Sequence, residues 1–135
     1  MGVAPYLRGT NMATKKTNSA PKFSKIEIDY EGETYTLRYD NSTILEMESK
    51  GVTAQKISDE AGSLTLTGME WLLDNLITPA FKLDQPEVTS EQVHEIWDGL
   101  DGKDELLGAL VELFMQPIVA ITTNPTETRA KFRLV

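Results

Sequence analysis

The segment Glu105–Ile121 is the strongest constraint on how this chain folds, because almost all of it is apolar. At 100° per residue, its leucine, valine, isoleucine and phenylalanine side chains cover a wide arc of a helix, and its few polar side chains share one edge. A helix with so wide an apolar surface is normally buried by several neighbours. We therefore expect a central core helix, with a kink or break near Phe114–Gln116 because Pro117 lacks a backbone N–H.

The composition allows one domain and excludes several kinds of site. A chain of 135 residues with 40% hydrophobic residues is long enough to build one core. It contains no cysteine, which excludes disulfides, thiolate ligands and thiol nucleophiles. No run approaches the ~20 apolar residues that span a bilayer, and the N-terminal region lacks the apolar stretch of a secretory signal. We expect a cytoplasmic protein that does not bind membranes.

The net charge of −8 is unevenly distributed along the chain. Residues 1–25 hold five basic side chains and no acidic one, and residues 129–133 hold three more basic side chains. All 21 acidic side chains lie within residues 27–127, where only five basic ones accompany them, so this part has a net charge of −16. An acidic surface repels phosphate groups, so we expect no binding of nucleic acid and a preference for basic partners.

The two ends of the chain differ in composition from the middle. Residues 1–22 are predicted to form a disordered basic leader, because small and polar residues follow one another there without a period. Arg8-Gly9 can be encoded by a purine-rich ribosome-binding sequence, and Met12 follows it closely. We expect translation to begin at Met12 and residues 1–11 to be an upstream extension. Residues 122–135 are polar and basic, and we expect them to form a C-terminal tail.

The clearest local pattern is a β-hairpin within Phe23–Tyr39. Apolar and polar residues alternate on both sides of Glu31-Gly32, as they do in strands with one buried face. A two-residue turn there pairs Ile28 with Tyr35, and the apolar side chains of both strands then share one face. An isolated hairpin is marginally stable in water, so this face must pack on helices.

Helical periodicity and helix-end signals predict the remaining elements. Asp40-Asn41-Ser42 forms a turn and N-cap, and a capping box at Thr89–Gln92 opens a later helix. The predicted helical segments are Thr43–Lys50, Val52–Glu60 with a break at residues 61–63, Leu64–Phe81, 89–100 and Glu105–Ile121. The predicted fold class is therefore α+β, with one domain over residues 23–121 in which the hairpin packs on a small bundle of four to five α-helices.

Two tryptophans are the candidate partner-binding residues. Trp71 does not belong to the apolar stripe of Leu64–Phe81 and projects from the opposite side of that helix. Either a neighbouring element covers it, or it is an exposed anchor for a partner, since tryptophan is enriched at interface hot spots. The sequence leaves both alternatives open. Trp97 is the second candidate, although it lies on the apolar stripe of its own helix.

The sequence lacks the patterns of a catalytic or metal site. His94 is the single histidine and is predicted on the exposed side of its helix, and in a chain without cysteine it forms neither a catalytic triad nor a metal cluster. Asp98–Asp104 resembles a calcium loop only superficially, because Ala109 stands where the loop needs glutamate. No glycine-rich loop fits a phosphate. We expect a non-enzymatic protein without a metal or cofactor.

The order of these parts resembles the small tail assembly chaperones of long-tailed phages and prophages of Gram-positive bacteria. A basic N-terminus leads into a hairpin with a Glu-Gly turn, a short helix, two helices of medium length and a final apolar helix that contains a proline. The residues that carry the likeness are Glu31–Tyr39, Ile44–Gly51 and Leu106–Pro117, within residues 23–121.

The resemblance implies a non-enzymatic protein of the bacterial host cytoplasm that is absent from the finished virion. Such chaperones coat the long, helical, hydrophobic tape measure protein, keep it soluble and recruit tail tube subunits around it. The tape measure protein and the tail tube protein are therefore the expected partners, and a homo-oligomer stays open. The family often makes a longer second product by ribosomal frameshifting, and the switch would fall within Thr122–Val135.

Two other functions are compatible with the sequence. A structural protein of the virion, such as a tail or head–tail connector component, would form a ring and be present in purified particles. An acidic mimic of nucleic acid would block a basic DNA-binding enzyme of the host, but the basic ends and the alternating hairpin argue against that function.

Overall fold

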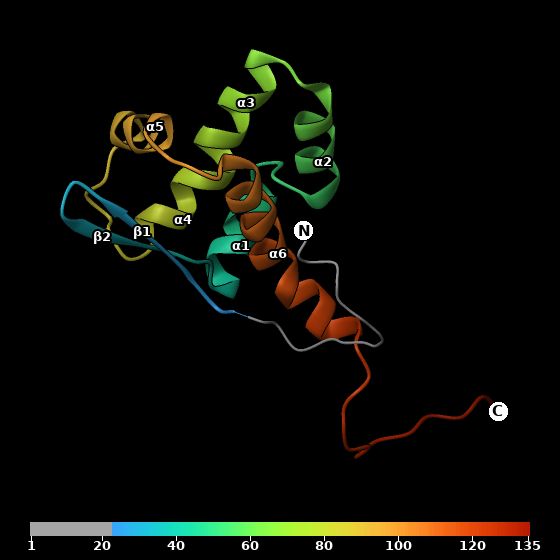
Figure 1. Ribbon diagram of the computed structural model, residues 1–135. Coiled ribbons are helices and arrows are strands. Elements are labelled where there is room, and N and C mark those ends of the chain that lie inside the picture. The colour runs from blue at the N-terminus through green and yellow to red at the C-terminus, as the bar shows by residue number, and fades with distance from the viewer. Residues whose placement is uncertain (1–22) are drawn as a thin grey trace, which may run out of the picture. The chain divides into compact units, whose positions relative to one another are not determined.

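Residues 23–135 are described by the computed structural model of the chain (Figure 1). The predictions for residues 1–22, including translation from Met12, lie outside these residues. The described chain divides into two compact units, one ending at Gln116 and the other beginning at Pro117. The first unit contains the hairpin and most of the helices, and it ends slightly before the predicted domain boundary at residue 121.

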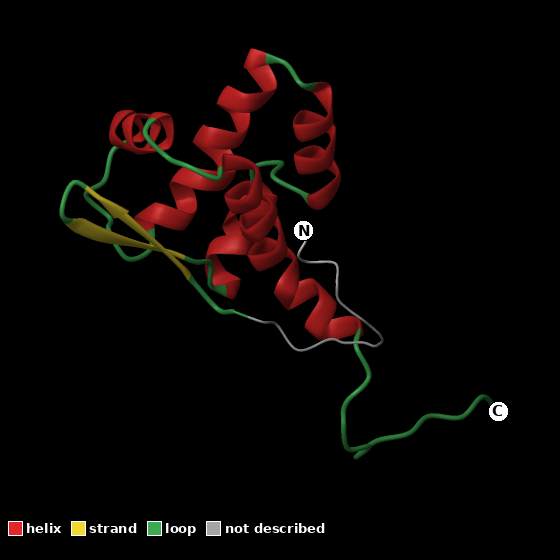
Figure 2. Ribbon diagram, in the orientation of Figure 1, coloured by secondary structure: helices red, strands yellow, loops and turns green. Residues whose placement is uncertain are grey.

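The architecture is α+β, as predicted, with an antiparallel two-stranded sheet followed by helices (Figure 2). The elements in chain order are β1 (Ile26–Tyr30), β2 (Glu33–Leu37), α1 (Asn41–Ser49), α2 (Ala54–Ser63), α3 (Leu66–Leu72), the π-helical turn η2 (Leu73–Ile77), α4 (Thr78–Lys82), α5 (Ser90–Asp98) and α6 (Lys103–Thr122). Because α3, η2 and α4 follow one another without a gap, residues 66–82 form one helical segment. Residues 123–135 contain no helix or strand.

The hairpin has the predicted register. Ile28 pairs with Tyr35 in the antiparallel ladder, and Glu31 and Gly32 form the two-residue turn. Their φ angles are +48° and +84°, as a type I′ turn requires, and this turn matches the natural twist of the strands. The apolar face of the hairpin therefore turns toward the helices, where Leu37 is completely buried.

Strand β2 is held by side chains that follow α4. The Arg38 guanidinium donates two hydrogen bonds to the Asp84 carboxylate, Nε to Oδ2 at 2.8 Å and Nη2 to Oδ1 at 2.9 Å. The Gln85 amide bonds to both backbone groups of Thr36, at 2.8 and 3.0 Å. The hydrogen bond from Arg38 holds the pKa of the Asp84 carboxyl below its usual value.

The helix starts follow the predicted capping signals. Asp40, Thr53, Thr65 and Thr89 each accept a hydrogen bond from the backbone N–H three residues later. Such a side chain satisfies an N–H group that the first turn of a helix leaves without a partner. The cap predicted within Asp40-Asn41-Ser42 lies at Asp40, so α1 begins two residues before the predicted Thr43, and the capping box predicted at Thr89–Gln92 is confirmed.

The predicted break at residues 61–63 is wrong, because α2 continues through them to Ser63. The Ser63 hydroxyl donates to the carbonyl of Glu60 at 2.8 Å, so this small polar side chain is accommodated on the helix instead of ending it. The chain reverses at Leu64, whose φ of +53° is left-handed. For a leucine this conformation costs roughly 1–2 kcal/mol.

Pro79 does not end the helical segment 66–82, because the π-helical turn η2 accommodates it. Proline has no N–H, and its ring clashes with the carbonyl four residues earlier, here that of Asn75. In η2 the pairing shifts to residues five apart: the backbone N–H and the hydroxyl of Thr78 both donate to the carbonyl of Leu73. The segment then continues to Lys82.

The core consists of two clusters of buried side chains, which share the segment 66–82 and α6. The hairpin cluster contains Ile28, Leu37, Leu73, Ile77, Ala80, Phe81, Val88, Val93, Ile96, Trp97, Leu110 and Leu113. The α1–α2 cluster contains Ile44, Met47, Val52, Ile57, Leu72, Leu76 and Phe114. Leu107 of α6 packs against both clusters.

Helix α6 connects the two clusters, as expected of a central helix, but it is less buried than predicted. Leu110 and Leu113 belong to the hairpin cluster, and Phe114 belongs to the α1–α2 cluster. These three are its buried residues, whereas Val119 and Ile121 are 40% and 85% exposed. Only a narrow stripe of the helix is therefore buried, and not most of its circumference.

The predicted break near Phe114–Gln116 is wrong, because α6 continues through Pro117 to Thr122. The missing N–H of Pro117 removes one helical hydrogen bond, but the ring is accommodated without ending the helix. By length and composition, α6 is also the one described helix that could cross a membrane, with a mean hydropathy of 1.5. Its buried residues lie in the core clusters, so it serves as a core helix of a globular domain.

Gly68 lies where α3 meets α2, and a side chain there has no room. An added Cβ would lie 2.5 Å from the Ser63 Oγ and 2.6 Å from the Glu60 carbonyl oxygen. We expect Gly68→Ala to lower the free energy of unfolding by about 1–3 kcal/mol, as measured by urea denaturation. Gly62→Ala is the control, since nothing lies within 4 Å and alanine favours the helix by about 0.5–1 kcal/mol. Equal effects of the two substitutions would contradict a tight contact.

Asp84→Asn should make the stability of the protein less dependent on pH in the acid range. Because the pKa of Asp84 is lower in the folded chain, its charge stabilises the fold above the unfolded pKa of about 4, and this stability is lost as the pH falls through the folded pKa. Urea denaturation between about pH 5 and pH 2 should show a smaller loss for the variant than for the wild type. Asp101→Asn, at an exposed position, should follow the wild type. If Asp84→Asn lost as much stability on acidification as the wild type does, the charge of Asp84 would not stabilise the fold.

Candidate protein-binding surface

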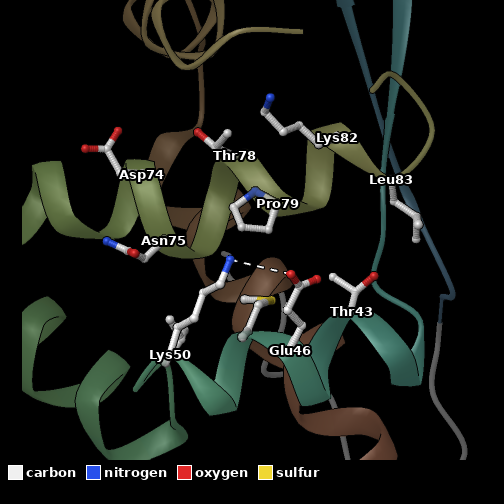
Figure 3. A pocket seen from close by; sticks show the side chains of 11 residues that line it. Thr43, Glu46, Lys50, Asp74, Asn75, Thr78, Pro79, Lys82 and Leu83 are labelled. Carbon is white, nitrogen blue, oxygen red and sulfur yellow. Dashed lines mark ion pairs between the residues drawn. The ribbon is translucent and has the colours of Figure 1, made fainter. Parts of the chain in front are cut away.

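A groove of about 470 Å³ separates α1 from the end of the segment 66–82 (Figure 3). Its lining residues are Thr43, Glu46, Met47, Lys50, Val52, Asp74, Asn75, Thr78, Pro79, Lys82 and Leu83. Met47 and Val52 are only 5% and 3% exposed, so they form the base of the groove together with the ring of Pro79. The base is therefore apolar.

The rim of the groove carries charges of both signs. Glu46 and Lys50 form an ion pair on α1, with Nζ and Oε2 3.5 Å apart. Asp74 and Lys82 are exposed on the opposite wall (Figure 3). Exposed ion pairs contribute little to stability, so Glu46 and Lys50 can rearrange around a bound partner at small cost.

The π-helical turn η2 shapes one wall of the groove. Thr78 donates its hydroxyl to the Leu73 carbonyl at 2.7 Å, and Asn75 donates its amide to the Trp71 carbonyl at 2.9 Å. Both side chains thereby satisfy backbone groups of the irregular turn, and the adjacent ring of Pro79 faces the groove. π-Helical turns occur frequently at functional sites, where they displace side chains from regular helical positions.

An apolar base between charged rims suits a protein segment better than a small cofactor. A partner helix with one apolar face buries that face on the base and leaves its polar edges at the rim. Among residues 23–135, no group of three or more histidine, aspartate or glutamate side chains is arranged to hold a metal ion. The groove is therefore a candidate site for a helical protein partner.

A second, smaller hollow lies between the hairpin turn and α5. It has a volume of about 200 Å³ and is lined by Tyr30, Glu31, Glu33, Tyr35, Gln92, Glu95 and Ile96. Burial and then the nearby Glu31 and Glu95 raise the pKa of the Tyr30 phenol. With three carboxylates, this hollow favours basic groups.

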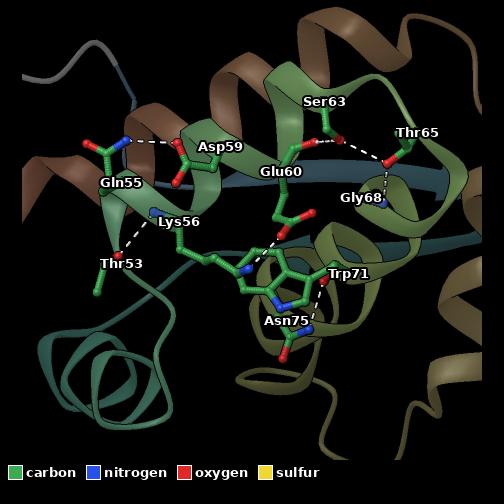
Figure 4. A network of polar contacts seen from close by, with 10 residues as sticks. All are labelled: Thr53, Gln55, Lys56, Asp59, Glu60, Ser63, Thr65, Gly68, Trp71 and Asn75. Carbon is green, nitrogen blue, oxygen red and sulfur yellow. Dashed lines mark hydrogen bonds and ion pairs between the residues drawn. The ribbon is translucent and has the colours of Figure 1, made fainter.

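Trp71 is partly covered by a neighbouring helix and partly exposed. Each of the two alternatives, a covered residue and an exposed anchor, therefore holds for part of its side chain. The Lys56 ammonium of α2 lies 5.5 Å from the centre of its ring and pairs with Glu60 at 2.6 Å (Figure 4). Trp71 also packs against the α1–α2 cluster. Part of the ring stays accessible, so Trp71 remains a candidate contact for a partner.

Trp97 is a core residue, and this excludes it from the binding surface. Only 7% of it is exposed, and it belongs to the hairpin cluster together with Ile96 and Val93. The periodicity of α5 already placed Trp97 on the apolar stripe, and that stripe faces the core. The prediction that Trp97 contacts a partner is therefore wrong, because its ring is buried in the hairpin cluster.

His94 joins α5 to η2 through Asp74. Its Nε2 lies 3.0 Å from the Asp74 Oδ1, and the Ser90 hydroxyl donates to the same oxygen at 2.9 Å. In a catalytic triad the histidine stands between the serine and the acid. Here the serine and the histidine both contact the acid, so the cluster connects two elements.

The residues of the groove were not recognised as a site in the sequence. They come from two segments about 30 residues apart, and no pattern in either segment indicates that the other lies opposite. Pro79 is the one signal that could have been used, since a proline inside a strong helical pattern indicates an irregular turn.

The family model described as a domain of unknown function (DUF5055) matches residues 12–134. The match covers most of the chain, and the chain belongs to this family. It includes most of residues 122–135, so the family domain extends past the compact unit that ends at Gln116. No curated protein and no solved structure matches the chain.

Lys56→Ala should expose more of the Trp71 ring. We expect stronger quenching of tryptophan fluorescence by acrylamide, because Trp97 is buried and Lys56 covers Trp71. Loss of the cation–π contact should also lower the free energy of unfolding by about 0.5–1 kcal/mol. Lys50→Ala, which removes an exposed lysine of α1, should leave the quenching unchanged. Unchanged quenching in Lys56→Ala would show that Lys56 does not shield the ring.

Proposed function

We propose that this chain is a tail assembly chaperone of a long-tailed phage or prophage of Gram-positive bacteria. It binds the tape measure protein, keeps it soluble in the cytoplasm of the bacterial host and recruits tail tube subunits, and it does so without catalysing a reaction. The observation that carries the proposal is the groove between α1 and residues 74–83, because its apolar base and charged rim suit an amphipathic helix.

The groove matches the client that the resemblance implies. A long helical protein with exposed apolar residues aggregates unless those residues are covered. Met47, Val52 and Pro79 offer apolar surface to one turn or more of such a helix, and Lys50 and Lys82 offer charge at its edges. Each contact of this size is weak, and many copies along one client supply the strength through avidity.

The charge of the domain supports the same function. Residues 27–127 carry a net charge of −16, which keeps a complex with a hydrophobic client in solution. The acidic hollow at Tyr30, Glu33 and Glu95 adds a place for basic groups of a client or of a tail tube subunit.

A structural tail or head–tail connector protein is the alternative. Among the described residues no strand pairs with the outer edge of β1, which favours this alternative, because a free strand edge can join copies of a protein into a larger assembly. The two functions differ in one observable: a virion component is present in purified particles, whereas an assembly chaperone is absent from them.

Co-expression with the largest coiled-coil-rich protein encoded just downstream tests the proposal. We expect the wild-type chain to make that protein soluble and to co-purify with it. Leu83→Glu, which places a charge in the groove, should reduce the co-purified amount about tenfold if it removes roughly 1.4 kcal/mol of binding free energy. Trp71→Ala tests the second contact in the same assay.

Leu45→Glu is the matched control, because Leu45 is 66% exposed on α1 and does not line the groove. It should leave both solubility and co-purification unchanged, and circular dichroism should show that both glutamate variants are folded. An equal loss with Leu45→Glu would contradict binding in the groove. Absence of any interaction, together with detection of the chain in purified particles, would favour the structural alternative.

A further inference from the structure

The two edges of the β-sheet differ in how their backbone groups are satisfied. In an antiparallel ladder, residues of every second pair point their N–H and C=O groups away from each other. Glu27 pairs with Thr36, and both backbone groups of Thr36 bond outward to the Gln85 side chain. The backbone groups of Glu27, and by the same period those of Asp29, therefore point outward from β1.

Among the described residues, side chains close the β2 edge, whereas no strand pairs with the outer edge of β1. Gln85 accepts from the Thr36 N–H at 2.8 Å and donates to the Thr36 carbonyl at 3.0 Å, as a neighbouring strand would. The Arg38 N–H donates to the Ala80 carbonyl at 3.3 Å. In the described part of the chain, the sheet contains no third strand beside β1. An open edge of this kind can accept an additional strand.

Glu27 and Asp29 make the exposed face of β1 acidic. Lys25, just before the strand, lies 3.8 Å from Glu27, and Thr34 of β2 donates to Asp29 at 2.7 Å, and both contacts are exposed. The side chains of Glu27 and Asp29 are exposed and alternate along β1 with Ile26, Ile28 and Tyr30, which face the core. A strand added to this edge places its side chains beside those of β1 on the same two faces. It should therefore carry basic residues at every second position and apolar residues between them.

Residues 129–135 have this alternation. Arg129, Lys131 and Arg133 alternate with Ala130, Phe132 and Leu134. The segment contains no helix or strand, and Phe132 and Leu134 are 87% and 92% exposed. Two large apolar side chains at this exposure gain burial when the segment joins a sheet.

We propose that residues 129–135 of a second copy of this chain add to β1 as a third strand. The basic side chains lie beside Glu27 and Asp29 on the exposed face, and the apolar side chains extend the buried face of Ile26 and Ile28. Opposite charges in neighbouring strands stabilise such a pairing, and the backbone hydrogen bonds supply the affinity.

The occupant is the tail of a second copy, whose charges and alternation complement those of β1. Pairing of a tail with its own hairpin would leave the wild type monomeric. Since the tail of one copy binds the hairpin of the next, the interface is head-to-tail. Interfaces of this type close into rings or continue as open chains. The proposal does not rest on the chaperone function, since it concerns only copies of this protein.

Sedimentation of the full-length protein at increasing concentration tests the proposal. The wild type should associate beyond a monomer, and raising the salt from 0.05 to about 0.5 M should weaken the association, because exposed charge pairs are screened. Lys131→Glu/Arg133→Glu should weaken it at least tenfold. Lys103→Glu reverses a charge on α6, outside the tail, β1 and the groove, and should leave the association unchanged.

A mixing experiment identifies the partner surface. The hairpin variant Glu27→Lys/Asp29→Lys should also be monomeric, because its edge repels a basic tail. Mixed with Lys131→Glu/Arg133→Glu, it should associate again, since each variant then offers an edge that complements the other's tail.

Three outcomes would overturn the proposal: a monomeric wild type at all concentrations, unchanged association of either charge variant, or no association in the mixture. Circular dichroism of each variant separates loss of association from loss of fold. Because no tape measure protein is present in these assays, their failure leaves the chaperone proposal intact, and failure of the co-expression assay leaves this one intact.

Discussion

The rest of the structure depends on the helical segment 66–82, because this one stretch must supply both core clusters. Leu72 and Leu76 belong to the α1–α2 cluster, whereas Leu73 and Ile77 belong to the hairpin cluster. Residues next to each other in sequence are about 100° apart around a helix, so the two clusters meet along this segment. The hairpin, α1 and α5 each pack on a face that the segment provides, and neither cluster can form without it.

Pro79 connects this core segment to the surface. The π-helical turn η2, in which Thr78 donates to Leu73, directly precedes its ring. The same turn forms a wall of the groove, and one residue further on the Ala80 carbonyl accepts from the N–H of Arg38 at the end of the hairpin. The irregular turn at Pro79 thus lies next to both the groove and the contact that holds the end of the hairpin. This local irregularity, and not a recognisable motif, gives the domain its candidate site.

The sequence predicted what depends on neighbours along the chain and missed what depends on distant ones. The hairpin register followed from alternation around Glu31-Gly32, and the capping box at Thr89 followed from residues three apart. The two wrong breaks, at residues 61–63 and near Pro117, came from treating glycine, serine and proline as sufficient to end a helix, although packing can outweigh their local cost. The groove and the half-covered state of Trp71 depend on contacts between segments, which no single-segment pattern contains.

The groove and the β1 edge use different residues, so occupation of one leaves the other open. The groove is lined by residues 43–52 and 74–83, and the edge consists of the backbone of Glu27 and Asp29. A helix bound in the groove contributes no hydrogen bonds to β1, and a strand added to β1 covers none of the groove. If copies are linked tail to edge, a long client that binds one groove meets the next at high effective concentration. Weak individual grooves are then sufficient for stable coverage of a client, and a partner too short to reach a second groove gains nothing from the linkage.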